Sequence, residues 1–100
     1  TTRYPCVAAL PMAVLVQAVT ALDFSAASVP ALFWYVDQDQ VVRADITADV
    51  ARRWGGSVTT VQPTLGANDD PFAHVIAGDI LSPDQTANTV AGILEWARGL

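Results

Sequence analysis

The order of hydrophobic and polar positions divides the chain into helices and strands that alternate as in an α/β domain. Apolar residues recur at helical spacing over about 11–22 and 43–54, and again near the carboxyl end. Segment 31–36 is apolar throughout, which is typical of a strand buried on both faces, and 57–62 mixes β-branched and polar residues. We therefore expect one α/β domain over residues 1–100.

The two predicted strands are joined by the helix at 43–54, which makes them a βαβ unit with parallel strands and a right-handed crossover. Asp37 and Asp39 follow the first strand, and a long loop, 63–73, leads from the second strand to His74. Chemistry in open α/β sheets gathers at the carboxyl edge of the strands, so we expect these side chains to meet there.

Several residues predict where the helices begin and end. Gly55-Gly56 predicts a left-handed stop for the second helix, and Asp49 lies four residues before Arg53, as in a weakly favourable ion pair. Ser82, followed by Pro83 and later by a glutamine, predicts a capped start for the final helix.

The apolar positions also predict which helix faces are buried. The first helix is apolar nearly all round, which indicates burial between layers or a missing partner. In the second helix one face is lined by Ile46, Val50 and Trp54. The buried face expected for the third helix is Val90, Ile93, Leu94 and Ala97.

Composition excludes several classes of function. The chain has 100 residues, is 52% hydrophobic and carries a net charge of −5, which argues against nucleic acid or an anionic membrane as partner. It contains no lysine, which excludes Schiff-base chemistry on lysine. Cys6 is the sole cysteine, and the sequence has no run of transmembrane length, so we expect no internal disulfide and a cytoplasmic location.

Asp39 and His74 are the leading candidates for chemistry. A carboxylate beside an imidazole holds one tautomer of the ring and stabilises its protonated form, so the ring can act as a general base. On spacing alone an alternative stays open, in which Asp39 caps the following helix and His74 is a loop residue with satisfied hydrogen bonds.

The segments around these two residues resemble the α/β-hydrolase family. Residues 30–42, Pro-Ala-Leu-Phe-Trp-Tyr-Val-Asp-Gln-Asp-Gln-Val-Val, resemble the stretch that carries the triad acid, and residues 74–83, His-Val-Ile-Ala-Gly-Asp-Ile-Leu-Ser-Pro, the stretch that carries the triad histidine. The resemblance covers about 23–100, including Trp54-Gly55 and the closing Ile-Leu-Glu-Trp. It implies Asp39 rather than Asp37 as the acid, from the Asp-x-Val-Val pattern.

The chain departs from the family at two points. Val36 stands where a glycine is frequent, and the Gly-x-Ser-x-Gly nucleophile motif is absent from the sequence. The resemblance therefore implies a partial α/β-hydrolase fold, the C-terminal part of a serine hydrolase. Residues 1–22 would be a helical segment after the cap, and 23–100 the last two strands and their helices.

Other candidate sites are weaker. Cys6 could be a nucleophile, although its apolar neighbours favour a buried structural role. Asp69, Asp70 and His74 could bind a metal, but solvated turn acids are the better interpretation, and we expect neither a metal nor a cofactor.

The aromatic residues near the strand and loop have two interpretations. Trp34 and Tyr35 could line a substrate pocket, but core packing is favoured. Phe72 could be a pocket wall or a loop anchor, and Asp79 is expected in a turn.

Two functions are consistent with these patterns. The first is a serine hydrolase of ester or lipid-type substrates, esterase- or lysophospholipase-like, of which this chain carries the acid and the base and is inactive alone. The alternative is a non-catalytic, self-associating interaction module. In either case the apolar, charge-free strand 31–36 has an unpaired edge, which predicts a homodimer unless residues 1–10 fold back over it.

Overall fold

The computed structural model describes residues 3–100, and its centre is a two-stranded parallel sheet. β1 (Ala31–Trp34) pairs with β2 (Val58–Val61), with Ala31 opposite Val58 and Trp34 opposite Val61. The helix α2 (Ala44–Arg53) connects the strands, which confirms the predicted parallel βαβ arrangement. Both strands are two residues shorter than predicted, and Val36, beyond the end of β1, is 1% exposed.

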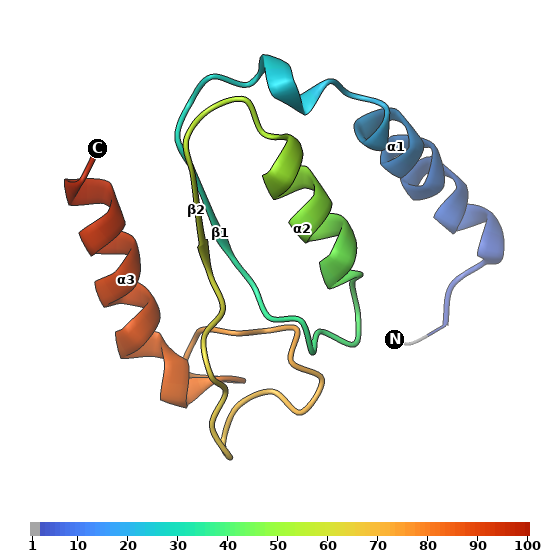
Figure 1. Cartoon of the computed structure of the whole chain (residues 1–100). Coiled ribbons are helices and arrows are strands. Elements are labelled where there is room, and N and C mark those ends of the chain that lie inside the picture. Colours follow the sequence, from blue (N-terminus) through green and yellow to red (C-terminus); the bar gives the residue numbers. More distant parts are fainter. Residues whose placement is uncertain (1–2) are drawn as a thin grey trace.

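The sheet lies between two helices (Figure 1). α2 covers one face, and α3 (Thr86–Arg98), which follows the short 3-10 helix η3 (Pro83–Gln85), lies along the other. The side chains of neighbouring strand residues point to opposite faces of the sheet, because side chains alternate along a strand. The Phe33 ring meets the Trp54 ring edge-on at 6.0 Å between centroids, while the Trp34 ring lies against Gly92 of α3.

The buried residues of α2 are two alanines, Ala44 and Ala51, while Ile46, on the apolar face, is 42% exposed. Trp54 lies just past the helix end, and its indole N–H donates to the carbonyl of Val29 at 2.8 Å. The predicted ion pair on the solvent side is confirmed, with Arg53 Nε 2.7 Å from a carboxylate oxygen of Asp49.

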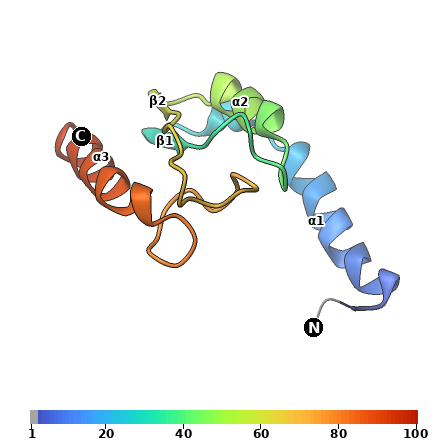
Figure 2. The ribbon, with the colours of Figure 1, turned by 90° about the horizontal axis from the view of Figure 1, so that it is seen from below.

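Two helices leave their apolar side chains in solvent. α1 (Leu10–Thr20) follows the 3-10 helix η1 (Cys6–Ala9) and extends away from the sheet (Figure 2), with every residue exposed. Burial between layers is therefore wrong for α1, and a missing partner stays a prediction. The buried face predicted for α3 is wrong, because Val90, Ile93 and Leu94 are 53%, 43% and 48% exposed. Ala97 is exposed as well.

The start of the final helical segment also differs from the prediction. The Ser82 side chain makes no capping bond to η3, although the proline does occupy the first helical turn. The hydroxyl of Ser82 is instead buried and bonded to the loop that carries His74. No helix within residues 3–100 is both long and apolar enough to cross a membrane.

Gly55 and Gly56 are required by close packing and not by a left-handed turn. Among the described residues the positive φ angles belong to Ala73 and Gly78, so the predicted left-handed stop is wrong. A Cβ atom on Gly55 would lie 1.9 Å from the carbonyl oxygen of Ser25, and one on Gly56 would lie 2.3 Å from that of Val29. These glycines let the α2–β2 connection lie against the segment of the 3-10 helix η2 (Phe24–Ala26).

Gly55→Ala is therefore expected to lower the free energy of unfolding by about 1–3 kcal/mol, the usual cost of overpacking. The added methyl meets backbone atoms that no rotamer change can move. Urea unfolding followed by tryptophan fluorescence measures the loss. Gly99→Ala is the matched control, because its Cβ would stay 3.4 Å from the nearest atom. Equal unfolding midpoints for the two variants would contradict the close approach at Gly55.

Candidate functional site

Asp39 lies in the turn after β1, where two backbone amides fix its carboxylate. Oδ1 accepts the N–H of Val41 at 2.8 Å and of Val42 at 2.9 Å. These bonds close the turn and leave Oδ2 directed elsewhere. The side chain is 10% exposed, so the sequence Asp-x-Val-Val builds a largely buried and oriented carboxylate.

His74 meets the free oxygen of that carboxylate. Its Nδ1 lies 3.0 Å from Asp39 Oδ2, and its side chain is 40% exposed. The prediction that Asp39 and His74 come together at the carboxyl edge of the strands is confirmed. Asp37 is exposed, and its backbone N–H donates to Gln62 Oε1 at 3.0 Å, so the structure selects Asp39 as the partner of the ring.

Gln40 joins the two loops that carry the pair. Its backbone N–H donates to the carbonyl of Phe72 at 2.9 Å, and its side-chain amide donates to the carbonyl of Pro71 at 3.3 Å. The acid turn and the histidine loop are thus bonded directly, one residue after Asp39 and two residues before His74. No signal in the sequence indicates this role, because a polar residue in a turn is equally consistent with solvent exposure.

The surroundings of Asp39 lower its pKa on balance. Burial raises the pKa, but the hydrogen bond from His74 and the N–H groups of Val42 and Val41 together outweigh it. The folded chain therefore binds this proton less tightly than the unfolded chain does. Ionised Asp39 thus stabilises the fold above its ordinary pKa of 3.8, and this contribution is lost as pH falls through the folded value.

His74→Ala is expected to raise the pKa of Asp39, because the ring supplies the largest of the contributions that lower it. The side-chain carbon signal of Asp39, followed by NMR over an acid titration, reports the value directly. The same variant should lose less stability on acidification than the parent chain. An unchanged Asp39 titration would show that the pair does not persist in solution.

Asp69 and Asp70 are structural acids and not the solvated turn residues expected. Asp69 is 8% exposed and accepts from Gly66 N at 2.6 Å, Asp84 N at 3.0 Å and Gln85 Nε2 at 2.7 Å. Burial raises the pKa of Asp69, and these bonds lower it below its ordinary value on balance. No group of three potential metal-binding side chains occurs among residues 3–100, so the metal alternative is not supported there.

The remaining candidates make no side-chain hydrogen bond to Asp39 or His74. Cys6 is exposed in η1, so the expected burial is wrong. Phe72 is 59% exposed beside His74, and Asp79 lies in a turn, as predicted, where it accepts the hydroxyl of Thr86 at 2.7 Å. Tyr35 is half-buried just past β1.

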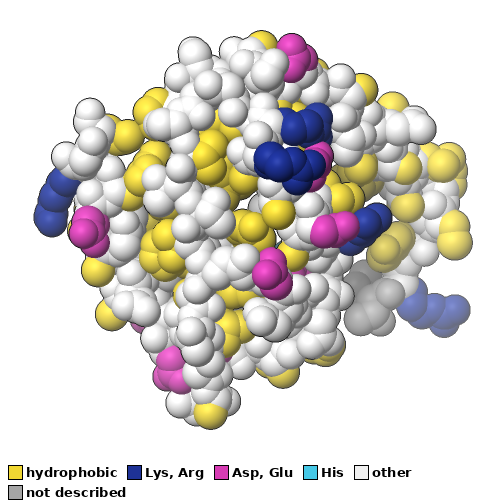
Figure 3. Space-filling model, viewed as in Figure 1, with side chains coloured by type: hydrophobic (Ala, Val, Ile, Leu, Met, Phe, Trp, Pro, Cys, Tyr) yellow, Lys and Arg dark blue, Asp and Glu magenta, His cyan; other side chains and the backbone are white. Residues whose placement is uncertain are grey.

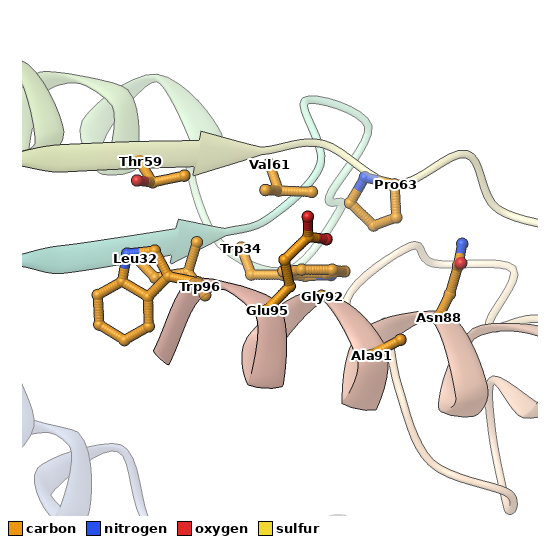
Figure 4. A pocket seen from close by; sticks show the side chains of 10 residues that line it. All are labelled: Leu32, Trp34, Thr59, Val61, Pro63, Asn88, Ala91, Gly92, Glu95 and Trp96. Carbon is orange, nitrogen blue, oxygen red and sulfur yellow. The ribbon is translucent and has the colours of Figure 1, made fainter. Parts of the chain in front are cut away.

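Trp34 packs on α3 and also lines a hollow of about 500 Å³ between the sheet and α3 (Figure 4). The apolar walls come from Leu32, Val61 and Trp96 among others, and Glu95 projects toward the strands. Neither Asp39 nor His74 is among the residues that line it. The hollow is therefore separate from the candidate pair.

The chain was compared with protein-family models, curated proteins and solved structures, and none of them matches it. The chemistry that can be assigned to this chain is therefore carried by the geometry of the pair itself: a buried, oriented carboxylate bonded to one nitrogen of an accessible imidazole.

Proposed function

We propose that Asp39 and His74 are the acid and base of a serine-hydrolase triad, in a partial α/β-hydrolase fold whose nucleophile comes from another segment. The observation that carries the proposal is the 3.0 Å contact between His74 Nδ1 and Asp39 Oδ2 at the carboxyl edge of the strands. The class of substrate, esters or lipids, comes from the resemblance of residues 23–100 to that family.

Each side chain has a defined task in such a reaction. Asp39 accepts the Nδ1–H of His74, which leaves a lone pair on Nε2 to take the proton of an attacking serine hydroxyl. The serine oxygen then bonds to the substrate carbonyl carbon, and the imidazolium that forms is stabilised by Asp39. His74 next gives the proton to the leaving group, and a water molecule repeats the sequence to release the acid.

The nucleophile and the oxyanion donors are the parts that this sequence lacks. The serines of the chain are not in a Gly-x-Ser-x-Gly motif, and Ser82 is fully buried. General-base help from an Asp–His pair alone is weak without a covalent route. We therefore expect the chain to be inactive on its own.

The test has two arms. The chain alone should show no turnover of a nitrophenyl ester above a His74→Ala control. Joined to the coding sequence that precedes it in its gene, it should gain hydrolysis that His74→Ala abolishes. Turnover by the chain alone that disappears in His74→Ala would reveal an overlooked nucleophile, with Cys6→Ser as the next variant. An extended protein without a Gly-x-Ser-x-Gly segment, or without His74-dependent turnover, would refute the proposal.

A second candidate is a non-catalytic interaction module that self-associates, and it is favoured by the open shape of the chain. The accessible surface is 7277 Å², against about 5,500 Å² for a compact monomer of this mass. The radius of gyration is 15.8 Å, against about 13 Å for a compact domain of this length. Figure 3 shows hydrophobic side chains exposed over α1 and in the middle of the visible face.

The excess of about 1,800 Å² is more than the roughly 800 Å² that each partner buries in a standard interface. A second copy is the partner that fits this surface in the isolated chain, because β1 and α1 carry no charged residue. In a complete hydrolase the same surface would be covered by the rest of that enzyme. An isolated chain that is monomeric at all concentrations would contradict the module.

A further inference from the structure

The loop that carries His74 has a backbone that needs external support. Residues 62–81 include neither a helix nor a strand. Ala73, directly before His74, has a φ angle of 54°, a left-handed conformation that disfavours side chains other than glycine, and it is 6% exposed. Some other group must therefore stabilise this conformation if the imidazole is to stay beside Asp39.

Asp70 binds every backbone N–H from Phe72 to Val75. Its Oδ1 accepts from Phe72 at 3.0 Å, and its Oδ2 accepts from His74 at 3.2 Å and from Val75 at 2.9 Å. Its backbone carbonyl accepts the N–H of Ala73 at 2.9 Å. The loop is thus a small nest of amides wrapped around one carboxylate, and the left-handed residue lets successive amides converge on it.

Ser82 joins the two ends of this nest. It is 0% exposed, and its Oγ accepts the backbone N–H of Asp70 at 3.0 Å and donates to the carbonyl of Val75. A single buried hydroxyl therefore connects the residue that begins the nest to the residue that ends it. Ser82 immediately precedes η3, which leads into α3.

We infer that Asp70 is a positioning residue for His74, and that Asp70 with Ser82 forms a clamp that sets the direction of the imidazole toward Asp39. The catalytic meaning of the clamp rests on the proposed function, but its effect on His74 does not. Three N–H groups on two oxygens favour the ionised carboxylate, because hydrogen bonds to a charged acceptor are stronger than those to a neutral one. Consistently, the N–H groups of Val75 and Phe72 hold the pKa of Asp70 below its ordinary value.

The test uses Asp70→Asn in the isolated chain, because an amide of the same size places an NH₂ group where one acceptor oxygen was. The ¹⁵N and ¹H signals of the His74 ring report the tautomer with a proton on Nδ1 bonded to Asp39. We expect that signature to weaken, and the amides of Phe72, His74 and Val75 to exchange at least about tenfold faster. Asp79→Asn is the matched control. Asp79 follows His74 in the chain, and its carboxylate accepts the hydroxyl of Thr86.

A second variant keeps the inference falsifiable if Asp70→Asn does not fold. Asp70→Glu retains the charge but moves both oxygens, so it should show the same loss of the His74 signature with an intact α2. Unchanged ring signals in either folded variant would overturn the clamp. In a complete hydrolase Asp70→Asn should lower kcat about 10²-fold with little change in KM.

These outcomes separate the clamp from the proposed function. If Asp70→Asn loses the His74 ring signature, and the extended protein shows no His74-dependent turnover, the clamp is supported and the hydrolase is refuted. His74-dependent turnover that Asp70→Asn leaves unchanged, with the ring signature also unchanged, would refute the clamp and support the hydrolase.

Discussion

Asp39→Asn is expected to lower kcat about 10⁴-fold in a hydrolase that contains this chain and a serine nucleophile, with KM nearly unchanged. The carboxylate accepts the Nδ1 proton of His74 through Oδ2, and its Oδ1 is already occupied by two backbone amides. An amide in this place turns its NH₂ group toward the ring, so Nδ1 becomes the acceptor and the proton moves to Nε2. Nε2 still faces the serine, but it now carries a proton and has no lone pair to accept one, so the base is lost although the geometry is kept.

Asp37→Asn is the matched control for this experiment. Asp37 lies two residues earlier in the same turn and has the same charge, but its side chain is exposed and the bond made there comes from its backbone. The kcat of the Asp37→Asn variant should therefore stay close to that of the parent enzyme. A large loss in Asp37→Asn with a small one in Asp39→Asn would reverse the choice of acid, and small losses in both would remove the triad assignment.

The meeting of Asp39 and His74 could be predicted from sequence because topology decides it. Apolar strands joined by a helix pair in parallel, and the loops after parallel strands lie at the same edge of the sheet. The structure has this arrangement, with β1 and β2 in register and the two side chains in contact. The order of the elements predicts the shared edge, and the resemblance of residues 30–42 and 74–83 to the hydrolase stretches selects Asp39 over Asp37.

The hydrogen bonds that hold the loops around Asp39 and His74 could not be predicted, because they join segments far apart in the chain. The local pattern of serine, proline and glutamine predicts that Ser82 caps a helix, but its hydroxyl bonds to Asp70 and Val75 instead. The sequence predicts that Gly55 ends a helix, but the residue is required because the carbonyl of Ser25 leaves no room for a Cβ atom. Local patterns identify residues suited to caps and turns and do not show which distant group competes for them.

The exposed apolar helices have a different cause. Periodicity showed that α1 and α3 have apolar faces, but a face is buried only where something covers it. Within residues 3–100 no element covers the outer face of α3. The helix α1 lies away from the sheet (Figure 2). η1 runs directly into α1, and this N-terminal segment lies away from β1, so residues 3–10 do not cover the strand edge, while residues 1–2 lie outside the described part of the chain.

The isolated chain is expected to form a two-fold dimer through the free edge of β1. Ala31 donates its N–H to the carbonyl of Ser57, just before β2, and Tyr35 donates to that of Val61. These bonds alternate along the strand, so the N–H groups of Leu32 and Trp34 face the open side. That edge carries apolar side chains and no charge, whereas β2 has the sequence Val-Thr-Thr-Val. An antiparallel copy of β1 would satisfy these amides and extend the sheet to four strands. Light scattering at micromolar concentration should give twice the mass of the chain.

Leu32→Pro is expected to convert this dimer to a monomer, because proline removes an N–H that faces the open edge while the bonds to β2 remain. Thr60→Pro is the matched control. It removes an outward N–H from the opposite edge of the sheet, so the dimer should persist. Circular dichroism shows whether each variant keeps its helices, and Leu32→Lys blocks the same edge with a charge if the proline disturbs folding. A parent chain with a monomer mass that does not change on dilution would exclude the dimer, and dissociation by Thr60→Pro alone would place the interface on β2.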